Sequence, residues 1–127
     1  LKERLRIANE KPSDMFISIH INSSEQKSAF GFEIFSLDVA SDRHAERLAA
    51  RENQKIDSKS DVDFIRADLL AFSHRKDSDV LARSVALALK SQMAKIVKKE
   101  LCDRGYNQAI FHVLFVKMPA ILAELFF

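Results

Sequence analysis

Two ionisable side chains stand inside apolar stretches of this sequence, and their types suit hydrolytic chemistry. His20 closes the run MFISIH, and Glu124 alternates with Leu122 and Phe126 in PAILAELFF. A neutral imidazole is the commonest metal ligand in proteins. A buried carboxylate either finds a partner or binds its proton more tightly, and such a group suits general-base attack by water. A hydrolytic zinc site is therefore one hypothesis for this pair.

Structural explanations for the same residues stay open at this level. His20 could be a core histidine satisfied by one hydrogen bond, and Glu124 could reach solvent from the end of a strand. Glu33 could face the same cleft as His20 if their strands are neighbours, or form a salt bridge at a strand edge. Among the other histidines we expect two to be solvated and one to pack against apolar neighbours: His44 and His74, and His112.

The composition predicts one globular domain. The chain has 127 residues, of which 47% are hydrophobic and 30% charged, enough to bury a core. No apolar run approaches the roughly 20 residues that span a bilayer. The formal net charge of +2, with acids and bases intermixed, does not indicate nucleic-acid binding. Cys102 is the single cysteine and excludes an internal disulfide. The first residues show no signal-peptide pattern.

Hydrophobic periodicity predicts the order helix, strand, strand, three helices, strand, strand. We expect the strands at 15–21, 30–37, 109–116 and 121–127. We expect the helices at 1–10, 41–53, 62–72 and 78–102, with Ser41 as an N-cap and Gly105 as the final stop. Because the strands are apolar on both faces, we expect an α/β fold: a three-layer domain whose central mixed, mostly parallel sheet is flanked by helices. His20 would then lie near the carboxyl end of a buried strand, where such sheets bind ligands.

Five segments in order along the chain resemble the zinc-dependent N-acetylmuramoyl-L-alanine amidases of the cell-division type. They are LKERLRIANEKPSDMFISIHIN, GFEIFSL, LAARENQ, DLLAFSHRKDSDVLA and FHVLFVKMPAILAEL. Each segment alone is a weak signal, whereas five in register are a specific one. The resemblance therefore covers almost the whole chain.

The resemblance implies a peptidoglycan hydrolase that cuts the amide bond between N-acetylmuramic acid and L-alanine of the stem peptide by zinc-activated water. It makes His20 a ligand of Zn²⁺, Glu124 the catalytic acid/base, and Asn22 a neighbour that shapes the site. A periplasmic or cell-envelope location in a bacterium, with peptidoglycan as the partner, is implied by the resemblance alone.

In this family an insertion forms a regulatory helix that covers the zinc until an activator protein displaces it. Residues 54–77 match that insertion in place and size, and Asp61 or Asp63 would be the acid that reaches the metal. The family's Gly-His-Gly-Gly motif, which holds its first zinc histidine, is not in this sequence. We therefore expect 1–127 to be an N-terminally truncated catalytic domain. The alternative is a non-catalytic remnant that binds the cell wall or an activator.

Overall fold

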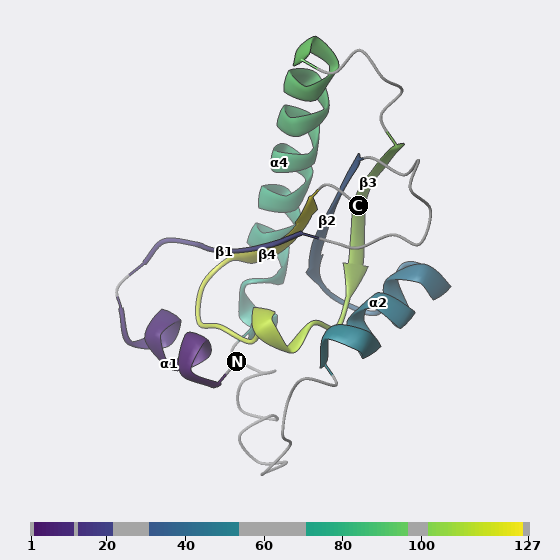
Figure 1. The fold of residues 1–127 in the computed structure, drawn as a ribbon. Helices are drawn as coiled ribbons and strands as arrows, with labels where there is room; N and C mark the ends of the chain where they lie inside the picture. The colour runs from purple at the N-terminus through teal and green to yellow at the C-terminus, as the bar shows by residue number, and fades with distance from the viewer. Residues whose placement is uncertain (1, 12, 22–30, 54–70, 97–101, 126–127) are drawn as a thin grey trace.

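The computed structural model describes residues 2–11, 13–21, 31–53, 71–96 and 102–125 (Figure 1). The elements, in chain order, are α1 (Lys2–Glu10), β1 (Phe16–Ile21), β2 (Gly31–Leu37), α2 (Arg43–Asn53), α4 (Arg75–Ile96), β3 (Cys102–Ala109), the 3-10 turn η1 (His112–Leu114) and β4 (Ala120–Leu125). Within these ranges, no helix has the length and apolar character needed to cross a membrane.

The four strands form one mixed sheet in the order β1-β4-β2-β3. β1 runs parallel to β4, β2 runs parallel to β3, and the central pair of β2 and β4 is antiparallel. Helix α4 packs along one face, and α2 lies across the opposite face (Figure 1). The predicted three-layer α/β fold with a mixed, mostly parallel sheet is confirmed.

The face under α4 is apolar and closely packed. Phe32 and Ile34 of β2 and Ile121 of β4 contact Ala82 and Ala86 of α4, and all five are buried. Because the alanine side chains are small, the helix axis lies close to the sheet. The larger side chains of the strands fill the space between the helix and the sheet. The predicted helical stripe through Leu81, Val85 and Leu89 flanks this contact and is partly buried.

The opposite face is covered by α2 and by the chain that leads into β4. Ala45, Leu48 and Ala49 of α2 are buried in one cluster with Phe35 of β2 and Leu122 of β4. The apolar residues that precede β4 fill the same cluster: Phe111, Val113, Leu114, Phe115 and Val116. The rings of Phe35 and Phe111 meet edge to face, with centroids 5.0 Å apart.

The predicted strand at 109–116 is wrong. The run is apolar because it fills the core beneath the sheet through η1, and it makes no ladder of its own. The third strand is instead the polar segment Cys102–Ala109, which begins where the long helix was expected to end and contains its expected stop, Gly105. β3 lies at an edge of the sheet, and an edge strand does not need two apolar faces. The described part of α4 ends at Ile96.

The strand at 15–21 was expected to be buried, and in the described residues β1 lies at an edge of the sheet. Its Phe16, Ser18 and His20 face the α2 side, while Ile19 and Ile21 on the other side are 67% and 80% exposed. Helix α4 reaches β4 but does not extend over these isoleucines. The apolar pattern of this strand therefore predicted burial that the described part of the chain does not supply.

The N-terminus of α2 is capped by Asp42 and not by the predicted Ser41. The Asp42 carboxylate accepts a hydrogen bond from the backbone N–H of Ala45 at 2.8 Å, which holds the pKa of Asp42 below its usual range. Ser41 instead exchanges two hydrogen bonds with Gln108 of β3, one through each backbone N–H. These contacts attach the start of α2 to β3.

Candidate active site

A row of three ionisable residues crosses one end of the sheet. Strand pairing places Glu124 of β4 opposite His20 of β1 on one side and opposite Glu33 of β2 on the other. Directly paired residues project from the same face of a sheet. All three side chains therefore lie on the α2 side, where the carboxyl ends of β1 and β4 meet the amino ends of β2 and β3.

His20 lies within ion-pair range of two carboxylates. Its Nδ1 is 3.8 Å from Oε1 of Glu124 and 3.7 Å from Oε2 of Glu52, which comes from the last turn of α2. The Glu124 side chain is 2% exposed, whereas those of Glu52 and His20 are 13% and 24% exposed. The imidazole thus lies between a buried acid and a more accessible one.

Helix α2 runs along this row and contacts both of its ends. His44 in its first turn contacts Glu33, and Glu52 in its last turn approaches His20. These two helix positions are about 12 Å apart along the axis. The strands that carry Glu33 and His20 are separated by two strand spacings, or about 9.6 Å. The helix length therefore matches the width of the row.

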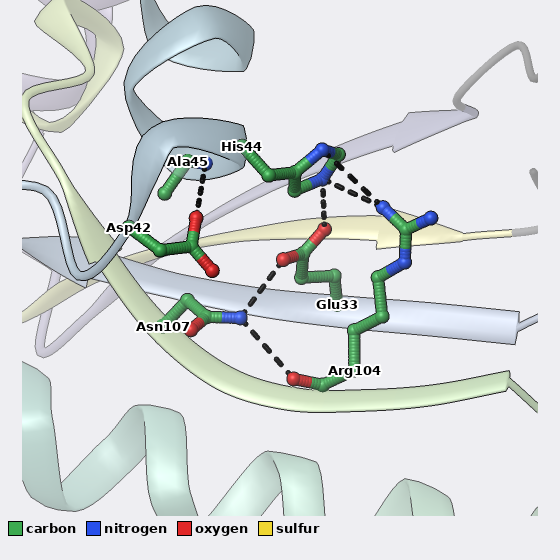
Figure 2. A network of polar contacts seen from close by, with 6 residues as sticks. All are labelled: Glu33, Asp42, His44, Ala45, Arg104 and Asn107. Atoms are coloured by element: carbon green, nitrogen blue, oxygen red, sulfur yellow. Dashed lines mark hydrogen bonds and ion pairs between the residues drawn. The ribbon is translucent and has the colours of Figure 1, made fainter.

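Glu33 is a buried acid held by contacts from α2 and β3 (Figure 2). It is 1% exposed, its Oε2 lies 3.0 Å from Nε2 of His44, and its Oε1 accepts a hydrogen bond from Nδ2 of Asn107 at 2.8 Å. Burial raises the pKa of Glu33, and His44, Arg104 and Asn107 partly oppose that rise. The carboxyl group is held firmly, but its charged form is disfavoured.

The end of α2 is fixed by Asn53. Its Nδ2 donates to the carbonyl of Ile110 at 2.7 Å, and its Oδ1 accepts from the N–H of His112 at 3.0 Å. With the contacts of Ser41 at the other end, α2 is attached to the chain on both sides of the row. Glu52, the residue before Asn53, is thereby positioned beside His20.

The donor types at His20 suit zinc, which binds imidazole nitrogen and carboxylate oxygen. A catalytic zinc takes three protein ligands. Within the parts of the chain that the structure describes, no group of three or more His, Cys, Asp or Glu is arranged to hold a metal ion. His20 therefore fits the role of one zinc ligand, while the described residues do not form a complete metal site.

The structure brings together the two residues singled out first. His20 and Glu124 are direct partners on adjacent strands, as the hypothesis of a shared site requires. Glu33 lies in the same row but is next to Glu124, because β4 lies between β1 and β2. Glu33 also contacts His44, a pair that is a salt bridge only when the imidazole is protonated, and it does so from a central strand and not from a strand edge. The predicted residues Asn22, Asp61 and Asp63 lie outside the described residues, as does 54–70 of the predicted insertion.

Sequence reasoning missed four residues of this region. His44 was expected to be solvated, yet it is half-buried against Glu33, because α2 turns its first turn toward the sheet. Glu52 shares a helix face with Ala45, Leu48 and Ala49, and a carboxylate on a core-facing stripe was the available signal. Arg104 and Asn107 lie in β3, in the segment between the predicted end of the long helix at 102 and the predicted strand at 109–116.

The comparisons with known proteins assign the class of this domain. All of residues 1–127 match the family described as N-acetylmuramoyl-L-alanine amidase, and the chain belongs to that family. It is similar to the N-acetylmuramoyl-L-alanine amidase AmiA of Escherichia coli (strain K12) and to the AmiA of Salmonella typhimurium (strain LT2). Each is 31% identical over 141 residues, a match that covers 98% of this chain and 45% of the relative. The chain thus spans less than half the length of these curated relatives. The family resemblance found in the sequence is confirmed.

Proposed function

We propose that this chain belongs to a peptidoglycan hydrolase of the bacterial envelope or periplasm that cuts the amide bond between N-acetylmuramic acid and L-alanine. Family membership supports the class of reaction. The observation that carries the assignment of residues is the pairing of His20 with Glu124, whose Nδ1 and Oε1 atoms are 3.8 Å apart at one end of the sheet.

Glu124 is the acid/base in this proposal. Its strand is hydrogen-bonded on both sides, so the carboxylate has little freedom to leave its position. It takes a proton from the attacking water, whose oxygen adds to the amide carbon. It then returns the proton to the leaving nitrogen as the C–N bond breaks, which yields a carboxylic acid and the free amine of L-alanine.

His20 is the zinc ligand that the described residues supply. The parallel pairing of β1 with β4 fixes its backbone, and its Nδ1 lies 3.7 Å from Glu52 and 3.8 Å from Glu124. Zinc, when bound, polarises the scissile carbonyl and lowers the pKa of the attacking water. Glu124, the partner of His20 on the adjacent strand, would accept the proton of that water.

Zinc content and amide cleavage of the purified chain test the proposal together. We expect zinc to be retained by the parent and by Glu124→Gln, and lost from His20→Ala. We expect only the parent to cleave an N-acetylmuramoyl-L-alanine peptide and so release a peptide with a free L-alanine amino group. Zinc binding that does not depend on His20, or cleavage that survives in Glu124→Gln, would contradict the assigned roles.

The second candidate is a non-catalytic amidase-like module that binds the cell wall or an activator. This is the alternative that the family resemblance left open, in which the fold is kept without a complete set of zinc ligands. A folded parent chain that binds the muramoyl peptide without cutting it, at any zinc concentration, would decide for this candidate.

Regulation by the segment 54–77 is a further part of the proposal, supported by the family's pattern of an inserted helix that an activator displaces. Asp61 or Asp63 would supply the contact to the metal. Deleting 57–72 from an intact enzyme should then raise basal hydrolysis, measured without activator. Unchanged or lower activity in a folded deletion variant would contradict regulation by this segment, but not the assignment of His20 and Glu124.

A further inference from the structure

A shift in strand register turns Arg104 toward the candidate site. Phe32 of β2 pairs with Asp103, but the next residue, Glu33, pairs with Gly105, so Arg104 is an extra residue in β3. Gly105 has φ of 68°, in the left-handed region that glycine adopts without strain. Such irregularities re-aim a side chain and are frequent beside active sites.

The direction of the neighbouring side chains shows what the shift achieves. Tyr106 faces α4, where its hydroxyl donates to Asp79, and Asn107 faces the α2 side, where it donates to Glu33. Regular alternation would place Arg104 on the side of Tyr106. Instead its Nη1 lies 2.7 Å from Nε2 of His44, on the side of the row (Figure 2).

A hydrogen-bond acceptor and a hydrogen-bond donor approach the same nitrogen of His44. Oε2 of Glu33 is 3.0 Å from Nε2, and Nη1 of Arg104 is 2.7 Å from it. A guanidinium only donates hydrogen bonds and an ionised carboxylate only accepts them. Nε2 therefore cannot bond to Arg104 and to ionised Glu33 at once. An anion that bound Arg104 would remove this competition and leave Nε2–H to donate to Glu33.

We propose that Arg104, oriented by His44, forms a subsite for a carboxylate on the peptide part of the substrate. The inference rests on the proposed function, since it takes the substrate to be a muramoyl peptide. Arg104 is exposed at the end of the sheet that carries His20 and Glu124, and a guanidinium matches a carboxylate in shape and charge.

Strand spacing sets the distance between this carboxylate and the bond that is cut. Gly105 is paired with Glu33, and Glu33 with Glu124, so Arg104 lies about two strand spacings, or roughly 10 Å, from the acid/base. An extended peptide covers about 3.4 Å per residue. The carboxylate should therefore lie about three residues beyond the scissile amide.

Two probes that differ by one charge test the subsite. They are an N-acetylmuramoyl tripeptide that begins with L-alanine and ends in a free carboxylate, and the same tripeptide ending in an amide. Dissociation constants are measured in the Glu124→Gln background so that neither probe is cut. We expect the carboxylate probe to bind at least about tenfold more tightly. Arg104→Gln should abolish that preference, and Arg47→Gln, the same change at an exposed position of α2, should keep it.

A second measurement reports on the geometry. Nitrogen NMR of the His44 ring should show Nε2 gaining its proton with the carboxylate probe and not with the amide probe. Equal binding of the two probes, a preference that survives in Arg104→Gln, or one that Arg47→Gln also removes would overturn the subsite alone. If neither probe binds, the proposed function fails with it.

Discussion

The two faces of the sheet differ in what they bury. Under α4, the alanines of the helix pack against Phe32, Ile34 and Ile121, and the contact is apolar. Under α2, the same strands bury Glu33 and Glu124, each 1% exposed. Burying a carboxylate lowers stability unless it is paired. The α4 face thus provides stability, and the α2 face uses part of it to hold ionisable groups in a fixed row.

The polar contacts on the α4 face form a cluster near the surface of the protein. The hydroxyl of Tyr106 donates to Asp79 and lies 2.9 Å from Oγ of Ser36, while the guanidinium of Arg83 is 4.5 Å from the centre of its ring. Burial and Asp79 raise the pKa of Tyr106, so its hydroxyl keeps its proton. This cluster joins α4 to the sheet near the surface, where solvent relieves its charges. Buried acids with internal contacts therefore lie on the α2 face, which carries the proposed site.

The largest expected effect separates the faces by chemistry. Glu124→Gln should lower the rate of amide cleavage by about 10²–10⁴-fold, the usual contribution of a general acid/base. Asp79→Asn makes the same carboxylate-to-amide change on the α4 face and should leave the rate within a factor of about two. Rates are compared on samples with matched circular dichroism spectra. Equal losses in both variants would show that the difference between the faces is not catalytic.

The next effect separates the faces by stability. Ile34→Ala removes a fully buried side chain under α4 and should lower the free energy of unfolding by about 2–5 kcal/mol, because it leaves a cavity. Ile19→Ala, at 67% exposure on β1, should change it by less than about 0.5 kcal/mol. Urea unfolding measures both. A larger loss for Ile19→Ala would mean that the β1 face is covered in solution.

A third test concerns the charge of Glu33. Burial raises its pKa in the folded protein, so its protonated form stabilises the fold below the ordinary glutamate pKa, and that stability is lost as pH rises through the raised value. Glu33→Gln does not titrate. The stability of the parent relative to Glu33→Gln should therefore fall as pH rises above the ordinary glutamate pKa of about 4.3. A difference that is constant or grows with pH would show that His44 and Arg104 outweigh burial.

The smallest effect tests how α2 is attached. Asn53→Ala removes two hydrogen bonds to the segment that leads into β4 and should lower the free energy of unfolding by about 1 kcal/mol. Asn53→Asp keeps the acceptor for His112 and should lose less. Hydrogen exchange in the last turn of α2 should quicken in the same order. Unchanged exchange in Asn53→Ala would place the attachment of α2 elsewhere.

Local periodicity predicted the elements whose burial pattern is strong. The short runs that are apolar on both faces, 15–21 and 30–37, identified β1 and β2, and the apolar stripe of 41–53 identified α2. β3 was not predicted because its sequence is polar, and an edge strand needs few apolar side chains. The run 109–116 was misassigned because burial of a loop beneath a sheet produces the same composition as burial of a strand.

The sequence by itself determined which residue types could act, since an imidazole and a carboxylate in apolar strands are costly enough to stand out at His20 and Glu124. Only the tertiary structure decided their neighbours. The insertion of β4 between β1 and β2 placed Glu33 next to Glu124, and the register shift at Gly105 turned Arg104 to the same side. Periodicity is a local property of the chain, whereas strand order and register depend on contacts between distant segments, so no local pattern could specify this row.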